Sequence, residues 1–398
     1  MSKAWRLVAL LSVTATASYL CRVNVSVTSV MMMRELGLSQ EAMGRIFSAF
    51  LLGYALCQIP GGMLADRFGA ARVLGWAALA WVAATLWIAG AGTVLPLLLA
   101  GRLLLGIAEA PTFPAAARAI AAWIPAAHRG RANGFVIAAI GLGSAIAPPL
   151  LSFVMVRWGW RTALLVSAVP ALAAAAAWMI VRPPATNEPA AAASADKGLP
   201  RSRSFILLTI SYTLQGYVGY IFVYWFFLYL VDVRHFDLMK SALLGAMPWL
   251  LSIVSIPLGG WLHDRLPRHR RLIPMVGLAG SGILIAAGAH TANAVFAVVC
   301  LALATALVLS VEGPFWATMT TIAGSRSGAA GGLMNMGSNL GGFISPALTP
   351  ILATWLGWES ALLVSAVLAI IAGALWFWIA PATAPEMPAT SAQTQPAT

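Results

Sequence analysis

Twelve apolar stretches, each about 20 residues long, follow one another along the chain. A helix of that length spans the hydrocarbon core of a bilayer, which is about 30 Å thick. A water-soluble core could not bury so many long apolar helices, so the sequence predicts an all-α membrane protein with twelve transmembrane helices. The predicted helices are 5–33, 42–64, 73–90, 94–123, 132–156, 160–181, 204–231, 241–262, 272–289, 293–320, 330–354 and 358–380.

The composition supports lipid as the solvent of this chain. Only 9% of the 398 residues are charged and 60% are hydrophobic, with a mean hydropathy of +0.86, whereas a soluble domain carries about 25% charged residues. The net charge of +12 is spread in short clusters between the apolar runs. We therefore expect the lipid bilayer as a partner and no nucleic acid, whose binding needs one basic patch.

The arrangement of lysine and arginine predicts how the chain is oriented. If the N-terminus is cytoplasmic, sixteen of these residues fall in inside segments and six in outside segments, as the positive-inside rule requires. We expect a polytopic protein of the plasma (inner) membrane with both termini in the cytoplasm. The apolar run after Lys3 and Arg6 continues to Met33, so we expect it to remain as the first helix rather than to be cleaved as a signal peptide.

The few metal-binding and nucleophilic residues are scattered. The three cysteines have neither disulfide nor zinc spacing, and the five histidines share no helical face. We therefore expect no metal, no cofactor and no enzymatic activity, because a membrane enzyme would need such groups clustered at an interface.

The chain repeats itself at an offset of 198 residues. Residues 160–169 read WRTALLVSAV and residues 358–367 read WESALLVSAV, and the same offset relates several glycines and prolines in between. The repeat predicts two parallel six-helix bundles, 1–181 and 204–380, with a substrate site between them near the middle of the membrane. Residues 182–203 are expected to form a cytoplasmic linker, and residues 381–398 a flexible cytoplasmic tail.

The segment after the second helix reads GMLADRFGAAR from Gly62 to Arg72, and a shorter copy follows the eighth helix at 260–265. It resembles the signature of the major facilitator superfamily, which implies that fold over nearly the whole chain. The resemblance, together with charged turns at helix ends, points to salt bridges that lock one conformation; the alternative is a solvated loop that serves only topology. The expected gating residues are Asp66, Arg67, Arg72, Asp264 and Arg265.

Four further stretches resemble the anion:cation symporter family within that superfamily. They are YLCRVN at 19–24, GIAEAPTFP at 106–114, GPFW at 313–316 and NMGSNLGGF at 335–343. The resemblance implies a secondary active transporter of small organic anions such as sugar acids, working by proton symport and alternating access, with the anion and protons as partners and a monomer as the unit. Cys21 stands where the family usually has an aspartate, which puts the coupling stoichiometry in question.

Four ionisable residues lie at membrane depth, namely Arg22, Arg102, Glu109 and Glu312. Each costs about 2.5–3.5 kcal/mol on insertion scales and is tolerated where it faces a partner or a wet cavity. The guanidinium fork of Arg22 suits two-point binding of a carboxylate. The alternative is a structural pair with Glu109.

The two acids are the candidates for proton coupling. An apolar cavity favours the protonated form of Glu109, although a permanent pair with Arg22 or Arg102 is the alternative. Arg102 lies two turns before Glu109 on the same face and either holds its charge or contacts substrate. Glu312 precedes Gly313 and Pro314 much as Glu109 precedes Ala110 and Pro111; it is either a second proton or substrate site or a solvated residue near one membrane face.

Aromatic and amide side chains complete the predicted substrate site. Helix 7 carries a tyrosine stripe at positions 217, 220 and 224, and helix 11 carries two asparagines one turn apart. Each of these sets either lines the cavity or packs between helices. With Arg22 and Arg102, the expected substrate-binding residues are Tyr19, Tyr54, Tyr220, Tyr224, Trp316, Asn335 and Asn339.

Two other functions remain open from the sequence. The chain could be an exporter or antiporter of organic compounds, since residues 141–148 partly echo the glycine- and proline-containing helix 5 signature of drug antiporters. It could also be a receptor on this fold that does not transport.

Overall fold

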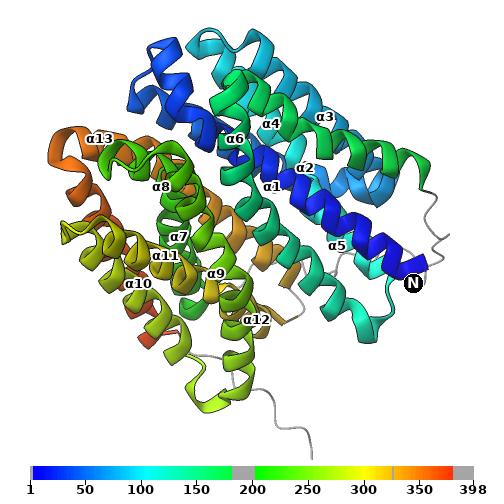
Figure 1. Cartoon of the computed structure of the whole chain (residues 1–398). Coiled ribbons are helices and arrows are strands. Elements are labelled where there is room, and N and C mark those ends of the chain that lie inside the picture. The colour runs from blue at the N-terminus through cyan, green and yellow to red at the C-terminus, as the bar shows by residue number, and fades with distance from the viewer. Residues whose placement is uncertain (1–2, 182–201, 325–326, 380–398) are drawn as a thin grey trace, which may run out of the picture.

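The computed structural model describes residues 3–181, 202–324 and 327–379. Every described element is a helix (Figure 1). Most of the predicted linker, residues 182–201, and the predicted tail lie outside the described residues.

The elements follow the predicted apolar stretches. In the first half they are α1 (Lys3–Leu36), α2 (Gln40–Phe68), α3 (Ala70–Ala91), α4 (Leu95–Glu109), α5 (Thr112–Trp123) and α6 (Ala126–Ile180). In the second half they are α7 (Arg203–Tyr224), α8 (Phe226–Leu228), a π-helix (Tyr229–Val233), α9 (Leu238–Arg265), a 3₁₀ turn (Pro267–His269), α10 (Leu272–His290), α11 (Ala294–Ser310), α12 (Glu312–Ala323), α13 (Ser327–Ala374) and a 3₁₀ turn (Leu375–Phe377).

Two elements are too long to be single spans, and each breaks at a glycine. Gly159 inside α6 has φ 81° and ψ 165°, and Gly357 inside α13 has φ 84° and ψ 158°. These torsions are open to glycine but strained for other residues. The two breaks are 198 residues apart, so the backbone repeats with the sequence. Ten described helices are long and apolar enough to cross a membrane, and dividing α6 and α13 at their glycines gives twelve segments.

Besides the predicted helix 204–231, which is divided at Trp225 into α7, α8 and the π-helix, two predicted helices are interrupted beside a proline. The predicted helix 94–123 is divided at Ala110 and Pro111 into α4 and α5, and 293–320 is divided at Val311 into α11 and α12. Pro111 and Pro314 explain the interruptions, because proline lacks an N–H and its ring clashes with the carbonyl one turn earlier. Each break lies next to one of the membrane-depth glutamates, Glu109 and Glu312.

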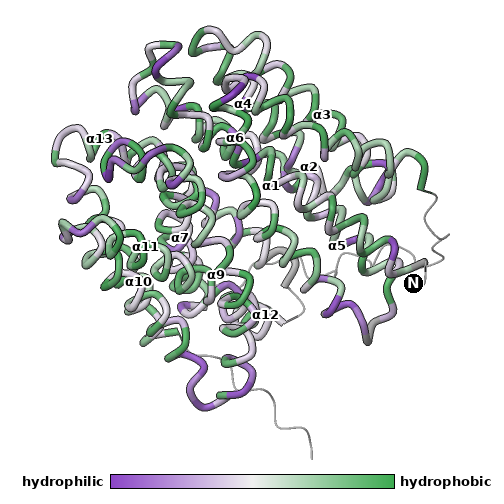
Figure 2. Tube along the Cα trace, in the orientation of Figure 1, coloured by the Kyte–Doolittle hydropathy of each residue, from purple (hydrophilic) through white to green (hydrophobic). Residues whose placement is uncertain are grey.

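The helices form two groups that lie side by side (Figure 1). In the first group α1 packs on α6, and in the second α7 packs on α13. The groups meet where α2 packs on α13 and where α6 packs on α9. Hydrophobic residues cover the long helices, whereas hydrophilic residues concentrate in the connecting turns (Figure 2), which is the pattern of a protein that faces lipid.

The two groups are sealed together at the predicted outer end. The Ser26 hydroxyl of α1 donates to the carbonyls of Val223 and Tyr224 of α7, each at 2.9 Å. The ring of Phe47 from α2 stacks on Tyr224 with 4.8 Å between centroids and meets Trp225 edge-on at 5.3 Å. We call these five residues the outer seal.

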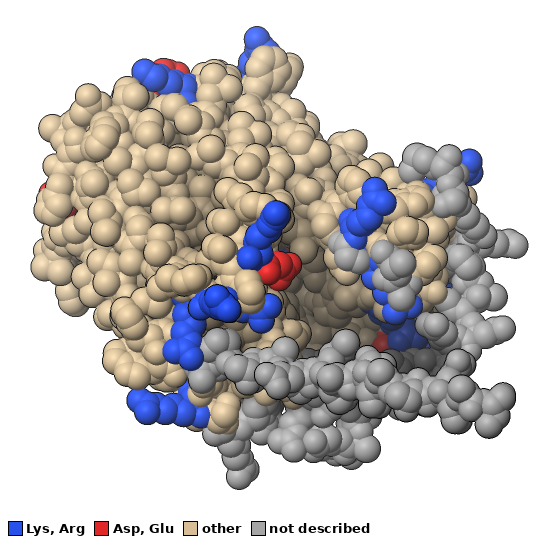
Figure 3. Space-filling model, turned by 90° about the horizontal axis from the view of Figure 1, so that it is seen from below, with Lys and Arg blue, Asp and Glu red and all other residues tan. Residues whose placement is uncertain are grey.

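Two further contacts extend this closure. Ser48 of α2 donates to the Phe343 carbonyl of α13 at 2.7 Å, and Arg34 lies 3.6 Å from Asp232 across the groups. Partial burial raises the pKa of Asp232, and the charge of Arg34 opposes that rise. Seen from the other end, the molecule is hollowed between the groups (Figure 3). The halves therefore meet at the predicted outer end, and a hollow opens between them at the predicted cytoplasmic end.

Candidate functional site

A close approach of α4 to α2 brings the polar and aromatic residues inside the first half together. A methyl group at Gly106 would lie 2.0 Å from the Phe50 carbonyl oxygen, so only glycine permits this distance between the two helices. The contact places Glu109, one turn after Gly106, beside α1, which carries Arg22. It also places Phe50 and Tyr54 of α2 beside the guanidinium of Arg22.

Arg22 and Glu109 form a buried ion pair. The Arg22 Nε donates to Glu109 Oε1 at 3.1 Å, and Nη2 lies 3.1 Å from the same oxygen. Ser18, one turn earlier on α1, also donates to that oxygen. Arg22 is 2% exposed and Glu109 is fully buried. The structure thus contains the pair that the sequence analysis gave as an alternative to substrate binding, and the two interpretations are compatible if the pair can open.

Aromatic rings surround the guanidinium of Arg22. Its Cζ lies 4.4 Å from the centre of the Tyr54 ring, 4.6 Å from Tyr19 and 5.1 Å from Phe50. Nη1 also donates to the Tyr19 hydroxyl at 3.3 Å, and Tyr220 of the other half is close enough to act on Arg22 electrostatically. Since rings cover the guanidinium, an anion can reach Arg22 only at its donor edges.

The pair is incompletely satisfied, which indicates that it can rearrange. One oxygen of Glu109 takes the contacts from Arg22 and Ser18, while Oε2 is buried and has no hydrogen-bond partner in the described part of the chain. A ligand carboxylate offers two oxygens to the same guanidinium, which is the stronger geometry. The same donor edge of Arg22 that contacts Glu109 therefore has the geometry to bind a ligand carboxylate.

Arg102 makes no direct ion pair with Glu109 among the described contacts, although the two charges are close enough to act on each other. Its Nη2 makes a long contact of 3.4 Å with the Arg22 carbonyl, and its Cζ lies 4.7 Å from the centre of the Phe50 ring. The remaining nitrogens, Nε and Nη1, are buried without a hydrogen-bond partner among the described residues. The Phe50 ring thus lies close to both guanidinium groups, and Arg102 is a fully buried cation.

Cys21 lies on the side of α1 that packs within the first half. It is 1% exposed, and its sulfur lies 3.4 Å from the Ser167 carbonyl in the second segment of α6. Asn24, one turn later, donates to the Ser167 hydroxyl at 2.9 Å. A thiol thus occupies this position, and the charges of Glu109 and Arg102 are close enough to act on it.

A second polar cluster lies in the other half around Glu312. Its Oε2 accepts from the Tyr212 hydroxyl at 2.7 Å and its Oε1 from Gln215 Nε2 at 2.9 Å. Trp316 donates to the same tyrosine hydroxyl at 3.2 Å. Glu312 is therefore held inside the bundle by neutral donors, which argues against the alternative that water alone solvates it. It is close enough to Tyr19 to act on it across the halves.

The tyrosines and asparagines divide between the predicted alternatives. The Tyr220 hydroxyl lies 3.4 Å from Asn339 Oδ1, and Tyr220 stacks on Tyr224 at 6.0 Å, so these three residues gather beside Arg22 and Arg102. Asn335 instead donates to Gln58 Oε1 of α2 at 2.7 Å, which joins the halves. Tyr217 is buried at the contact with α13, where its hydroxyl has no partner among the described residues, which favours packing.

The first two predicted gating residues lie within a helix rather than in a loop, and the ion-pair partner of Asp66 is a residue that was not among the predicted ones. Asp66 and Arg67 lie in the last turn of α2, and Gly69 alone separates it from α3. Asp66 forms its ion pair with Arg118 of α5.

The remaining gating candidates are more loosely placed. Arg72 lies on the exposed side of α3. In the second copy, Asp264 lies 3.7 Å from His263, and Arg265 lies 5.4 Å from the centre of the Trp261 ring. None of these contacts joins the two halves.

The Asp66–Arg118 pair predicts a conformational effect without a binding effect. It lies roughly three turns, about 18 Å, along α2 from Tyr54, so Asp66→Asn should leave equilibrium binding of the anion unchanged. An exposed ion pair stabilises the conformation that contains it by up to about 1 kcal/mol. Because its loss shifts the balance between conformations by that amount, we expect turnover in proteoliposomes to slow by up to about fivefold.

A double-mutant cycle identifies the partner. Arg118→Gln should slow turnover as Asp66→Asn does, and the double variant should be no slower, while Arg67→Gln should behave like the unchanged protein. Loss of binding in Asp66→Asn with unchanged conformational populations contradicts the gating role.

Several residues of the site carry no sequence signal of their own. Ser18 and Tyr212 each bond a glutamate, and Gln58 bonds Asn335 across the halves, yet none belongs to a motif used above. For Ser18 the available signal was its spacing of one turn before Arg22 on the same face of α1. For Tyr212 and Gln58, only the register between helices reveals the contact.

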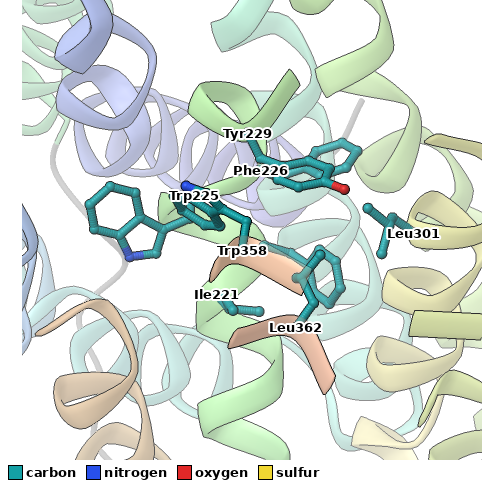
Figure 4. A pocket seen from close by; sticks show the side chains of 8 residues that line it. Ile221, Trp225, Phe226, Tyr229, Leu301, Trp358 and Leu362 are labelled. Carbon is teal, nitrogen blue, oxygen red and sulfur yellow. The ribbon is translucent and has the colours of Figure 1, made fainter. Parts of the chain in front are cut away.

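A small cavity in the second half is separate from this site. It has a volume of about 10 Å³, enough for one water at most. Figure 4 shows its lining, which includes Trp225, Phe226, Tyr229, Trp358 and Leu362. An apolar cavity of this size has no donor set for an anion. The described residues also contain no group of three or more potential metal ligands, and the three cysteines are unpaired.

The chain is similar to known transporters over most of its length. The family model of the Major Facilitator Superfamily matches residues 11–346 and 322–398. The chain is 34% identical over 363 residues to a probable sulfoacetate transporter of Cupriavidus necator, which covers 83% of each chain. It is 29% identical over 401 residues to a D-galactonate transporter of Escherichia coli, covering 91% of this chain and 92% of the relative.

A solved structure has the same fold. A bacterial homologue of the human lysosomal transporter Spinster, in an inward-facing and occupied conformation, superposes with a TM-score of 0.81 over 95% of this chain and 97% of its own, at 20% identity. This agreement confirms the predicted fold class. The relatives are named as transporters, which agrees with the expectation that the chain is not an enzyme.

Proposed function

The chain belongs to the major facilitator superfamily, and on this premise we propose that it is a secondary active transporter that carries small organic anions by proton symport. Its relatives are named for organic acids, sulfoacetate and D-galactonate. The single observation that carries the proposal is the buried Arg22–Glu109 pair with an unused carboxylate oxygen. It places an anion-binding cation and a proton acceptor at one point.

The pair links substrate to proton in a simple way. With Glu109 ionised, its carboxylate occupies the donor edge of Arg22 through Nε and Nη2. When Glu109 takes up a proton, its attraction for the guanidinium falls and the edge is free for a substrate carboxylate. Conversely, an anion bound to Arg22 displaces Glu109, whose charge is then buried without a partner, and this favours protonation. Anion and proton therefore promote each other's binding, which is symport expressed as linkage.

The opposite wall supplies groups that suit the rest of an organic acid. Tyr220 and Asn339 offer hydroxyl and amide groups beside Arg22, and the Trp316 indole and Glu312 lie deeper in the second half. Hydroxyl groups of a sugar acid could bond to these side chains while its carboxylate binds Arg22. In this proposal Glu312 is a second candidate for the proton.

Alternating access follows from where the halves touch. We propose that the bundles 1–181 and 204–380 move as two bodies in the plasma membrane with both termini cytoplasmic. The outer seal is closed and the other end is hollowed (Figure 3), so the structure corresponds to an inward-facing state of that cycle. The change to an outward-facing state requires the outer seal to separate and the cytoplasmic hollow to close.

The proposal is tested by uptake with the purified protein in proteoliposomes. Sulfoacetate and D-galactonate are the probes, and galactitol, which lacks the carboxylate, is the matched neutral compound. We expect a gradient that is acidic outside to drive accumulation of at least one anion and of no neutral compound, with alkalinisation outside. Thermal stabilisation by an anion without any transport would indicate a receptor, and anion-driven proton exchange in the opposite direction would indicate an antiporter.

A further inference from the structure

A strongly basic turn joins α9 to α10 at the predicted cytoplasmic end. Residues 263–271 read HDRLPRHRR, with four arginines, two histidines and one acid. None of these arginines forms an ion pair with an acidic residue in the described part of the chain. The turn is hydrophilic (Figure 2), and it belongs to a face on which lysine and arginine side chains gather (Figure 3). Membrane topology alone accounts for exposed basic residues at this place, so a ligand needs further evidence.

Two buried nitrogen donors supply that evidence. His263, in the last turn of α9, is 4% exposed, and neither of its ring nitrogens has a hydrogen-bond partner among the described residues. Its Nδ1 lies 3.7 Å from the Asp264 carboxylate, which is too far for a hydrogen bond. The Nε of Arg270 is also buried without a partner there, and Arg270 is close enough to His263 to act on it. Burial of such groups is costly unless an acceptor meets them.

The ring of His263 is held in place by close helix packing. A methyl group at Gly259 would lie 1.8 Å from the Ser310 carbonyl oxygen, and one at Gly313 would lie 3.2 Å from the Gly260 Cα. These contacts press α9 against the break between α11 and α12. His263 follows Gly259 by one turn on the same face, so its ring lies inside the second half, beneath the basic turn.

Exposed apolar side chains border the turn. Trp261 precedes it, Leu266 lies within it and Leu272 follows it, and all three are exposed. The Cζ of Arg265 lies 5.4 Å from the centre of the Trp261 ring. Tryptophan at a helix end is typical of the level of the lipid headgroups, where apolar side chains contact acyl chains. Basic and apolar groups side by side fit a ligand that carries both an acidic headgroup and acyl chains, whereas a small free anion would use only the basic groups.

We propose that the turn between α9 and α10 binds the headgroup of an anionic phospholipid. The phosphate oxygens of the lipid accept hydrogen bonds from the ring of His263 and from Arg270 Nε, and the exposed charge of Arg268 attracts the headgroup. The acyl chains lie against Trp261 and Leu272. This site is separate from the Arg22–Glu109 centre, and the inference does not depend on what the protein transports.

Lipid binding to the purified full chain in detergent, followed by native mass spectrometry, tests the charge requirement. The probes are dioleoylphosphatidylglycerol, which is anionic, and dioleoylphosphatidylcholine, which is zwitterionic. The double variant Arg268→Gln/Arg270→Gln should weaken binding of the anionic lipid by about tenfold or more and leave the zwitterionic lipid unchanged. The control Arg6→Gln/Arg203→Gln removes two exposed arginines from the same predicted side and should change binding by less than about twofold.

Substitution of His263 separates the buried donor from the charge of the turn. His263→Leu should weaken binding of dioleoylphosphatidylglycerol, whereas His263→Gln, whose amide still donates, should retain most of it. Elution as one species on size exclusion establishes that each variant folds. If His263→Leu does not fold, loss of the anionic lipid in a folded His263→Gln protein contradicts the donor role, and the double arginine variant still tests the site.

The remaining outcomes decide between a lipid site and simpler explanations. Equal weakening in both double variants would mean that the lipid follows the overall charge of the face, and equal affinity for the two lipids would mean that no acidic headgroup is recognised. Displacement of the lipid by an equal concentration of glycerol 3-phosphate would indicate a site for a free phosphate group. A photoreactive phosphatidylglycerol should cross-link within residues 261–272, and cross-links only elsewhere would place the lipid at another site. Each of these four results overturns the proposal, and failure of anion uptake affects none of them.

Discussion

Arg22→Lys should reduce anion uptake by about hundredfold or more although the positive charge is kept. Arg22 uses two nitrogens toward Glu109 and a third toward the Tyr19 hydroxyl, with three rings around its plane. An ammonium is a compact charge without a planar fork, so it cannot bind a carboxylate at two points. Hydrogen bonds to charged groups contribute about 1.5–3 kcal/mol each, and losing one of the two at the upper end of that range corresponds to a decrease of about hundredfold.

The measurement is initial uptake of sulfoacetate or D-galactonate into proteoliposomes, together with binding followed by thermal shift. Arg157→Lys, on an exposed arginine that stacks on Phe153, controls for the general effect of the substitution. Elution of the Arg22→Lys protein as one species on size exclusion establishes that it folds. An unchanged dissociation constant in that protein would remove Arg22 from the binding site.

Glu109→Gln should separate exchange from accumulation. The amide has nearly the shape of the protonated acid and still accepts from Ser18, but it neither binds nor releases a proton. We expect the variant to exchange labelled for unlabelled anion across the membrane, while a pH gradient no longer drives accumulation above the external concentration. In the unaltered protein, anion binding should weaken as the pH rises, because ionised Glu109 then competes for Arg22. In the variant, binding should not depend on pH.

Two further variants locate the proton if this expectation fails. If Glu109→Gln still concentrates the anion, Glu312→Gln and the double variant show whether the cluster with Tyr212 and Gln215 carries it. Accumulation in the double variant would mean coupling to another ion or no coupling to protons. Cys21→Asp is the converse test, since a rise in the measured proton-to-anion ratio would show that an acid at this position adds a coupling site.

The sequence predicted the fold and part of the site for identifiable reasons. A helix needs about 20 apolar residues to cross a membrane. Because such long stretches are easy to recognise, the ends of the helices could be predicted to within several residues. The 198-residue repeat went further, since Gly159 and Gly357 share both the offset and the backbone torsions. Arg22 and Glu109 could be proposed as partners because few charges lie at membrane depth, and a buried charge needs one of opposite sign.

The errors concern rotation and register between helices. A salt bridge was expected near Asp66, but its partner Arg118, fifty-two positions later on α5, was not predicted. The bond of Gln58 to Asn335 spans 277 positions. Such contacts depend on helix crossing angles and on which side chain faces the partner, and no periodicity within a single helix contains that information. The prolines at 111 and 314 were visible, but only packing decides whether a proline bends a helix or interrupts it.

The aromatic rings around Arg22 reduce the effect of dissolved salt on its charge. Dissolved ions screen charges over about 8 Å at physiological ionic strength, but they act through water, and buried pairs are screened much less. Rings at 4.4–5.1 Å from its Cζ and an exposure of 2% keep the guanidinium away from bulk electrolyte. The attraction between Arg22 and an anion bound at its donor edge should therefore be screened little by dissolved salt.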